Sequence, residues 1–343
     1  MTEKKITSGP AVLVEEYRGH TVENVHMGHI CGVGANGKIQ YAVGDTDYLT
    51  YLRSSGKPVQ ALPAIKAGVE EAFGLAENEV AVMAGSHRAE PMHVQALTSL
   101  MAKTGIAEEQ LICLPTYPLA VSARDALIAK GEPPRRIYHN CSGKHLGMIS
   151  YCKHRGHAME SYADPDGPLQ REIVDTLAML AEMPADEVVL GTDGCGCPVF
   201  AIPLFRLATV YLKLAVPALV EDQATRSAIE KLTAIMNRQY SLVSGTNLIC
   251  STLLMDDNIV AKGGAKGVYC FGLRRERLGF ALKVLDGSEE EWPLIVASIL
   301  EQIGYDRQET IDRLRRLAPA VIRNDNNVAV GENRPVFQLL TPE

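Results

Sequence analysis

A serine and a lysine three residues apart form the first segment of this chain that is typical of an active site. The segment Arg53–Pro58 has the sequence Arg-Ser-Ser-Gly-Lys-Pro, and it follows a β-like run and precedes a helix-like one. Three residues are nearly one helical turn, so the side chains of Ser54 and Lys57 would share a face. A partly desolvated lysine can lose its proton and accept one from the serine hydroxyl. The pattern therefore predicts a nucleophile with its own base, with no need for a histidine.

The Ser-x-x-Lys pattern is not specific by itself. About one match is expected by chance in a chain of this composition, and a second match, Ser150–Lys153, lies inside a helical pattern. Taken alone, Ser54 is better interpreted as a helix N-cap beside a solvated lysine. The other polar segments of the chain have to decide between the two interpretations.

Two of these segments come before apolar helical patterns. Ala84–Pro91 places polar side chains between an apolar run and a proline that can begin a helix, and the apolar run is expected to be a strand. His139–His145 has six polar or reactive side chains in seven residues, and its Cys141 and Lys144 are again three apart. The alternatives are a capping serine with surface side chains in the first segment, and a buried cysteine in the second.

The glycine-rich segment Gly194–Cys197 follows Asp193. Glycine lets the backbone come close to a ligand, and Asp193 could hold the ammonium group of an amino-acid substrate. A cysteine here could meet Cys141 and Lys144 at a soft metal ion such as zinc. By spacing alone this metal site is only weakly indicated, because the chain has no Cys-x-x-Cys pair or paired histidine motif and lysine is an unusual ligand.

A lysine followed by glycines occurs at the predicted end of a late strand, in Ala261–Gly267. This arrangement resembles the Lys-Thr-Gly element of serine β-lactamases and penicillin-binding proteins, which works beside a Ser-x-x-Lys. We expect the strand to bring Lys262 against the start of the Ser54 helix. The alternative is a glycine-rich hairpin with exposed lysines.

The hydrophobic pattern predicts strands near both ends of the chain and helices between them. We expect an α+β fold, an α/β sandwich, in which strands within 11–50 and 247–285 share one antiparallel sheet. Helices would pack on this sheet, with a helical subregion at about 90–240, and the whole chain, 1–343, would form one domain. The predicted strands are Ala11–Tyr17, Val22–Val33, Lys38–Val43, Asn247–Met255, Ile259–Ala261, Val268–Leu273 and Gly279–Leu285.

Helical spacing recurs through the middle of the chain and near its end, and the tail after Arg323 is loop-like with one possible last strand at Val336–Leu340. A hairpin turn is predicted at Asn36-Gly37. The predicted helices are Pro58–Ala67, Pro91–Lys103, Ser142–Arg155, Pro168–Glu182, Pro203–Lys213, Asp222–Met236, Glu289–Ile303 and Gln308–Leu317.

Bulk properties restrict the class of protein. With 343 residues, 46% of them hydrophobic, the chain can bury a large core, and its net charge of -7 argues against a nucleic-acid surface. The longest apolar region, Phe200–Val220, is interrupted by charges and prolines, which favours a core helix pair over a membrane span. Met1–Pro10 lacks the apolar stretch of a signal peptide. Because no export signal is predicted, the eight cysteines are expected to be reduced thiols in the cytoplasm.

As a set, the motifs resemble the asparaginase II family, the L-asparaginases similar to the inducible enzymes of Rhizobium etli. The resemblance runs from about Val12 to Val268. It is carried by Arg-Ser-Ser-x-Lys-Pro with Gln60-Ala61, Ser-His-x-x-Glu-Pro-Met-His, His-Asn-Cys-Ser-Gly-Lys-His and Asp-Gly-Cys-Gly-x-Pro. It implies a fold like that of serine β-lactamases and glutaminases, a homodimer, and hydrolysis of L-asparagine, a small-molecule amide, to L-aspartate and ammonia.

The resemblance also implies roles for particular residues. Two serine–lysine pairs would carry catalysis, a zinc ion would be held by two cysteines and a lysine, and polar side chains around them would bind the substrate. The expected catalytic residues are Ser54 with Lys57 as nucleophile and base, and Ser86 with Lys262; the expected zinc ligands are Cys141, Lys144 and Cys195; the expected substrate-binding residues are Arg53, His87, Glu90, Asn140 and Asp193.

Three segments depart from the family pattern. Lys266 replaces an acidic residue, Gln239–Ser241 stands where His-Pro-Glu is expected, and Asn247–Ile249 where Arg-Phe-Asp is expected. A charge reversal can change the pKa of a catalytic lysine or the pocket for a substrate carboxylate. The sequence therefore leaves two alternatives open: a related serine hydrolase, either a glutaminase or a penicillin-interacting enzyme, and a catalytically altered amino-acid-binding homologue.

Overall fold

The computed structural model describes residues 9–341, and the chain divides into two compact units. The sheet unit comprises the chain up to Tyr51, Ile202–Val216 and the chain from Asn258 onward. The helical unit comprises Leu52–Ala201 and Pro217–Asp257. The first eight residues of Met1–Pro10, where no signal peptide is predicted, lie outside the described residues.

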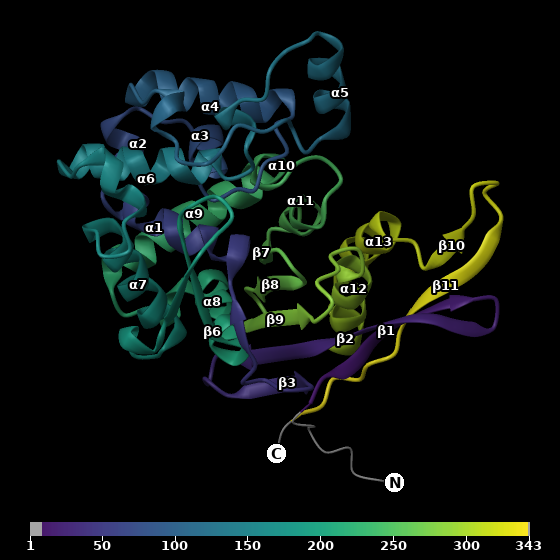
Figure 1. The fold of residues 1–343 in the computed structure, drawn as a ribbon. Helices are drawn as coiled ribbons and strands as arrows, with labels where there is room; N and C mark the ends of the chain where they lie inside the picture. Colours follow the sequence, from purple (N-terminus) through teal and green to yellow (C-terminus); the bar gives the residue numbers. More distant parts are fainter. Residues whose placement is uncertain (1–8, 342–343) are drawn as a thin grey trace. The chain divides into compact units, whose positions relative to one another are not determined.

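One antiparallel sheet dominates the sheet unit, with strand order β10-β11-β1-β2-β9-β8-β7 and β3 paired to β2 (Figure 1). Because β2 lies beside β9, the prediction that strands from the two ends of the chain share one antiparallel sheet is confirmed. The elements of this unit are β1 (Ala11–Arg18), β2 (Thr21–Gly34), β3 (Ile39–Val43), β4 (Leu49–Tyr51), α8 (Leu204–Ala215), β7 (Ile259–Gly263), β8 (Val268–Leu273), β9 (Leu278–Val284), α12 (Trp292–Gln302), α13 (Gln308–Leu317), β10 (Val321–Arg323) and β11 (Ala329–Pro335).

Helices cover both faces of the central strands, which explains why β7 and β8 are buried at every residue. On one face, α8 approaches the backbone so closely that a Cβ at Gly272 would lie 2.2 Å from the carbonyl oxygen of Tyr211. Successive residues of a strand point to opposite faces, so Tyr269 points away from α8. Its ring lies 5.1 Å from that of Trp292 in α12.

Helix α1 (Lys57–Lys66) is the centre of the helical unit, and it is buried from Lys57 to Ile65. A helix that is buried all round needs neighbours on every side, and α1 contacts α3, α6, α7 and α9. The remaining elements of this unit are α2 (Val69–Ala72), α3 (Glu77–Met83), α4 (Pro91–Thr104), α5 (Val121–Ala129), α6 (Ser142–Arg155), α7 (Pro168–Ala181), β5 (Val189–Thr192), β6 (Pro198–Pro203), α9 (Gln223–Arg238), α10 (Tyr240–Val243) and α11 (Ile249–Leu254).

The structure corrects two predicted strands. Asn247–Met255 is not a strand, because its apolar run forms the short helix α11, which begins where Ser251 accepts from the N–H of Leu248. The run that ends at Met83 is likewise a helix, α3. Short apolar runs do not distinguish a strand from a buried helix by periodicity alone.

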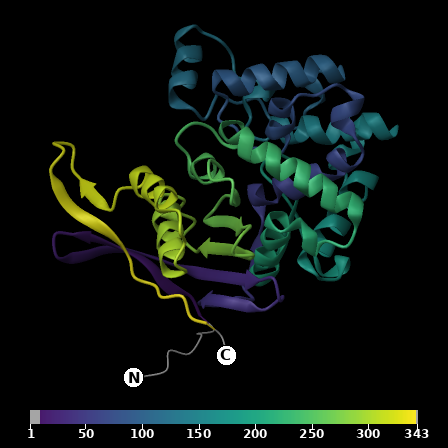
Figure 2. The ribbon, with the colours of Figure 1, turned by 180° about the vertical axis from the view of Figure 1, so that it is seen from behind.

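Three further segments differ, wholly or in part, from their predicted conformations. The loop predicted after Arg323 is confirmed for residues 324–328, which form the turn between β10 and β11, but the tail then continues as the strand β11, which pairs with β1 (Figure 2). Val336–Leu340 is not a strand and contributes only the single bridge between Leu340 and Ala42. Phe200–Val220 is not a helix pair but the end of β6 followed by α8. Among the described residues, no helix is long and apolar enough to span a membrane.

Candidate functional site

Ser54 and Lys57 lie where a tight turn enters helix α1. Arg53–Gly56 forms a 3-10 turn, and α1 begins at Lys57 with Pro58 in its first turn. Arg53 has φ of +50°, a conformation that costs free energy for any residue other than glycine and that often occurs at functional sites. The exposed fraction is 9% for Ser54 and 1% for Lys57, so the turn places both residues in the interior of the helical unit.

The amine of Lys57 is held by three oxygen atoms of the helical unit. Its Nζ lies 2.9 Å from the carbonyl oxygen of Gly85, 2.9 Å from Oγ of Ser86 and 3.0 Å from the carbonyl oxygen of Asn140. Within residues 9–341, no hydrogen bond joins this amine to Oγ of Ser54. The structure therefore joins Lys57 to Ser86, and the pairing of Lys57 with Ser54 stays a prediction.

The second predicted pair combines residues from different units. Lys262 lies on β7 in the sheet unit, where it is buried and its Nζ donates to the carbonyl oxygen of Gly263 at 2.7 Å. Ser86 lies in the helical unit, directly after the end of α3. The pairing of Ser86 with Lys262 therefore stays a prediction.

Glycines on α6 allow the close packing that assembles the acceptors around Lys57. A Cβ at Gly143 would lie 2.2 Å from the carbonyl oxygen of Val82, and a Cβ at Gly147 would lie 2.8 Å from Cε of Met83. These glycines are four residues apart, so they form one face of α6 against α3. The close approach brings the residue before Cys141 and the residues after α3 to the same amine.

Burial is the main influence on the charge of Lys57. It lowers the pKa of this lysine because the charged form loses its hydration. The thiols of Cys141 and Cys195 act in the opposite direction, and the ammonium of Lys144 lowers the pKa further. The pKa of Lys57 is lowered overall, which favours the neutral amine that a general base requires.

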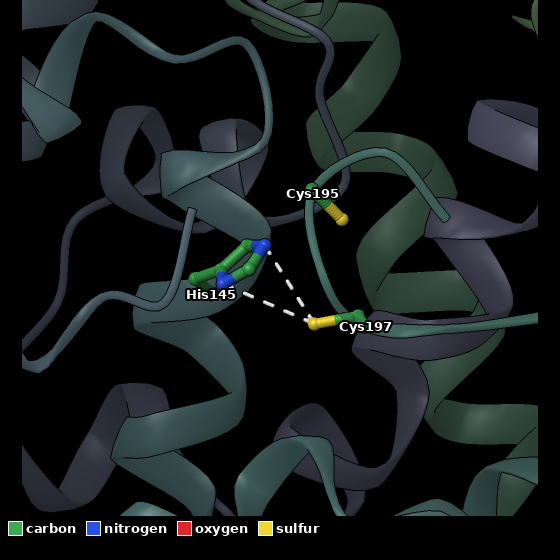
Figure 3. Close-up of side chains that lie close together, drawn as sticks. All are labelled: His145, Cys195 and Cys197. Atoms are coloured by element: carbon green, nitrogen blue, oxygen red, sulfur yellow. Dashed lines mark hydrogen bonds between the residues drawn. The ribbon is translucent and has the colours of Figure 1, made fainter. Parts of the chain in front are cut away.

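A cluster of thiols surrounds Lys144, which is fully enclosed in the helical unit. Its Nζ lies 3.1 Å from Sγ of Cys195. His145, Cys195 and Cys197 point toward one another (Figure 3), and Sγ of Cys197 lies 3.6 Å from Nε2 of His145. We call Cys141, Lys144, His145, Cys195 and Cys197 the thiol cluster.

The electrostatics of the thiol cluster favour charged sulfur ligands. The Cys141 thiol, by hydrogen bonding, is the largest influence on Cys195, whose pKa is lowered to about 7. Burial lowers the pKa of Lys144, but the sulfur atoms of Cys197, Cys141 and Cys195 raise it above its ordinary value on balance. Thiolates near neutral pH are the donors that zinc prefers.

The thiol cluster offers two overlapping sets of metal ligands. The set predicted from the sequence is Cys141, Lys144 and Cys195. The ligand atoms of His145, Cys195 and Cys197 lie within 4.8 Å of one another, so they form a second set that shares Cys195. Both sets fit a soft or borderline metal ion. His145 and Cys197 are not among the ligands predicted from the sequence, although the Cys-x-Cys spacing and the histidine directly after Lys144 are signals for them.

A five-residue hairpin loop between β5 and β6 presents Asp193 and Cys195. The N–H of Asp193 donates to the carbonyl oxygen of Cys197 at 2.9 Å, and Gly196 has φ of +88°, which glycine adopts without strain. Oδ1 of Asp193 forms an ion pair with Arg53 at 2.8 Å. Two predicted substrate-binding residues are thus brought together.

The other predicted substrate-binding residues are held by the protein itself. His87 is fully buried, with Nε2 at 2.8 Å from Oγ of Ser142 and Nδ1 accepting from the N–H of Ala89. Glu90 accepts two hydrogen bonds from Thr246, one from its N–H and one from its hydroxyl. In this arrangement both side chains support neighbouring segments, and their contact with a substrate stays a prediction, as does that of Asn140.

Comparison with solved structures gives fold-level similarities only. The chain is 17% identical to a class C β-lactamase from Rhodobacter sphaeroides, with a TM-score of 0.42 over 80% of this chain and 95% of the other. It is 14% identical to a β-lactamase from Mycobacterium bovis, with a TM-score of 0.39 over 80% and 94%. It is 12% identical to a Bacillus glutaminase, with a TM-score of 0.37 over 82% of this chain and 92% of the other. At this level of similarity the neighbours carry no argument about function.

The search of the curated proteins found no match. The sequence model of the L-asparaginase II family, in contrast, matches residues 14–335. This match includes every residue of the Lys57 environment and of the thiol cluster, and it extends through both units. The chain therefore belongs to the L-asparaginase II family of amidohydrolases.

Proposed function

We propose that the protein hydrolyses the side-chain amide of L-asparagine to L-aspartate and ammonia, in two acyl-transfer steps through Ser54. Membership of the family supports an amide substrate. The single observation that carries the mechanism is the buried amine of Lys57, with its lowered pKa and its contact with the hydroxyl of Ser86. Such an amine is a base that can serve a hydroxyl nucleophile.

The three acceptors around Lys57 define where its lone pair points when it is neutral. The carbonyl groups of Gly85 and Asn140 have no hydrogen to give, so the two N–H bonds of the neutral amine must point to them. The lone pair then faces Ser86, whose hydroxyl can donate to it. This arrangement supports a role for Ser86 in the transfer of a proton to or from Lys57.

The proposed reaction starts with transfer of the Ser54 proton to Lys57, for which the lone pair of the amine must turn from Ser86 toward Ser54. Oγ of Ser54 bonds to the amide carbon, and backbone N–H groups, including that of Ser54, stabilise the oxyanion. The carbon–nitrogen bond then breaks, and the proton passes through Ser86 to the leaving ammonia, with Lys262 in the role that the resemblance gives it. Water attacks the acyl-serine ester, its proton goes to Lys57, and the ester oxygen of Ser54 regains a proton as aspartate leaves.

The ion pair of Arg53 and Asp193 supports an amino-acid substrate. Nε of Arg53 is buried with no hydrogen-bond partner in the described part of the chain, and such an atom is costly to leave unsatisfied. Asp193 binds Arg53 and the N–H of Gly194 through Oδ1 alone. The guanidinium is therefore free to bind an α-carboxylate, and the second oxygen of Asp193 is free to accept from an α-ammonium.

The thiol cluster would hold a zinc ion near the substrate. Cys141, Lys144 and Cys195 are the proposed ligands, and His145 and Cys197 are additional donors from the second set. When bound, the ion would act as a Lewis acid that helps to orient the substrate. Hydrolysis by a serine nucleophile does not require it, so we assign no proton transfer to the metal.

We expect cobalt substituted into the thiol cluster to give a thiolate-to-cobalt absorption band. Cys195→Ser should remove this band because Cys195 belongs to both ligand sets. Cys141→Ser should weaken the band more than Cys197→Ser if the ligand set from the family applies, and less if the histidine-containing set applies. The measurement is the absorption spectrum of the cobalt-loaded protein. A wild-type protein with no such band would contradict the proposed metal site.

An ammonia-release assay with a series of amides tests the proposed function. We expect L-asparagine to be hydrolysed at a higher kcat/KM than L-glutamine, D-asparagine or succinamic acid, which lacks the α-ammonium group that Asp193 would bind. Wild-type protein and Ser54→Ala are compared at equal concentration. Release of ammonia from none of the amides, with ligand-dependent stabilisation only, would instead support an amino-acid-binding homologue.

One observation favours a different amide as the second candidate substrate. Ser86 donates its N–H to the carbonyl oxygen of Val243, two residues after the segment Gln239–Ser241, which departs from the family pattern. Changes in this segment can therefore alter the surroundings of a proposed catalytic serine.

A higher kcat/KM for L-glutamine would identify a glutaminase, and β-lactam labelling of Ser54 without amide turnover would identify a penicillin-interacting enzyme. The homodimer and the cytoplasmic location also remain proposals.

A further inference from the structure

Three carboxylates surround one histidine in the sheet unit, and none of these four residues belongs to the proposed catalytic or substrate-binding set. Oε1 of Glu16, on β1, lies 2.7 Å from Nε2 of His26, on β2. Oε1 of Glu291, directly before α12, lies 3.4 Å from the same nitrogen. Oδ2 of Asp286, in the turn after β9, lies 2.6 Å from Nδ1. Two carboxylates thus converge on one ring nitrogen, and the third holds the other nitrogen.

The charge of this cluster is not balanced by the protein. Even with a protonated imidazole, three carboxylates leave two negative charges uncompensated. Within the described part of the chain, no lysine or arginine forms an ion pair with Glu16, Asp286 or Glu291. The side chain of Glu291 is only 4% exposed, and its Oε2 is buried without a hydrogen-bond partner. A buried carboxylate oxygen is normally satisfied by a donor or a metal ion.

We propose that Glu16, His26 and Glu291 bind a divalent first-row metal ion such as Zn²⁺. Their ligand atoms lie within 4.8 Å of one another, and the ion would replace the proton on Nε2 of the ring. Asp286 then accepts from Nδ1–H, which fixes the tautomer that leaves Nε2 free, as carboxylates commonly do behind metal-binding histidines.

The composition of the site selects the class of ion. One imidazole and two carboxylates suit Zn²⁺ or Mn²⁺, whereas Ca²⁺ and Mg²⁺ prefer oxygen ligands only. The ligands come from two paired strands and the start of a helix, so the framework is rigid. Entry from solvent is open on the side of Glu16 and Asp286, whose side chains are 25% and 42% exposed. The site contains no sulfur, so it can be distinguished from the thiol cluster.

Zinc titration of the metal-free full-length chain, carrying Cys195→Ser to disable the thiol cluster, tests the proposal by calorimetry. We expect one zinc ion per chain to bind this protein, and the added change His26→Gln to abolish that binding. Asp286→Asn should weaken zinc binding by about 10- to 100-fold, because it removes the support of the ring but no ligand. Glu15→Gln is the matched control, since its side chain points to the opposite face of β1 from that of Glu16.

Two results would overturn the proposal: no zinc binding by the Cys195→Ser protein, or zinc binding that is unchanged by His26→Gln. Glu16→Gln provides a second variant at a partly exposed position, and it should weaken zinc binding at least 10-fold while the circular dichroism spectrum stays that of the parent. Cobalt bound in the Cys195→Ser protein should show no thiolate-to-cobalt band that depends on His26, because this site offers only nitrogen and oxygen. A His26-dependent thiolate band would also contradict the proposed ligands.

Discussion

Replacement of Ser54 by alanine is expected to reduce ammonia release from L-asparagine by roughly 10⁴- to 10⁶-fold, the range seen when an enzyme loses its nucleophile. The substitution removes one oxygen atom at a position that is 9% exposed, and no hydrogen bond of this hydroxyl holds the described structure together. The fold should therefore be retained. The kcat measured by an ammonia assay, with thermal unfolding as the check on the fold, gives the result.

Two neighbouring variants make the Ser54 result specific. Ser55→Ala removes the hydrogen bond from Oγ of Ser55 to the carbonyl oxygen of Leu52 at 2.7 Å, so it should lower stability and leave the acylation chemistry in place. Ser86→Ala removes the hydroxyl that contacts Lys57, and it should slow turnover by about 10²- to 10⁴-fold as a lost proton-transfer group does. Full activity in Ser54→Ala with complete loss in Ser86→Ala would assign the nucleophile to Ser86 instead.

Replacement of Lys57 by alanine is expected to reduce kcat by about 10²- to 10⁴-fold, the usual contribution of a general base. Lys57→Arg should be as inactive as Lys57→Ala, because an arginine stays protonated and cannot accept the serine proton. Only the neutral amine is a base, so kcat/KM of the wild type should rise with pH through the lowered pKa of Lys57 and become constant above it. The measurement is a pH profile of kcat/KM for each variant.

The sign of this pH dependence follows from burial. Enclosure of Lys57 penalises its charged form and lowers its pKa, which moves the active range toward neutral pH. If the pKa were not lowered, activity would increase only near the ordinary value for lysine, roughly 10.4. A rate that is independent of pH, or an active Lys57→Arg variant, would contradict the assignment of Lys57 as the base.

Elements whose ends are marked by clear capping or turn residues could be predicted from the sequence. Ser142–Arg155 and Gln308–Leu317 were predicted with the observed bounds, because glycine or a polar residue marks their ends and apolar residues recur at helical spacing within them. The prediction of a strand at Asn247–Met255 was wrong because a six-residue buried helix has the same apolar content as a strand. The β10–β11 hairpin was missed because β10 has only three residues and β11 (Ala-Val-Gly-Glu-Asn-Arg-Pro) lacks the alternation of apolar and polar residues that signals a half-buried strand.

The contacts of the site depend on packing that no local pattern contains. Lys57, the first residue of α1, meets Ser86 after the end of α3 because these two helices pack against each other, and no local sequence pattern contains that contact. Lys57 and Lys144 are both buried lysines three residues after a serine or a cysteine, yet the pKa of one is lowered and that of the other is raised. The thiol cluster makes the difference, because sulfur atoms stabilise the ammonium of Lys144. The same residue type at the same spacing thus acquires opposite charge preferences.

Mass spectrometry of protein quenched with acid during turnover of L-asparagine tests whether Ser54 is the nucleophile. We expect a peptide containing Ser54 that carries one aspartyl group in ester linkage, in the wild type but not in Ser54→Ala. Ser86→Ala should decrease the amount of trapped ester, because Ser86 passes the proton to the leaving ammonia in the first step. An aspartyl group found on Ser86, or turnover with no acylated serine at any time, would contradict the account.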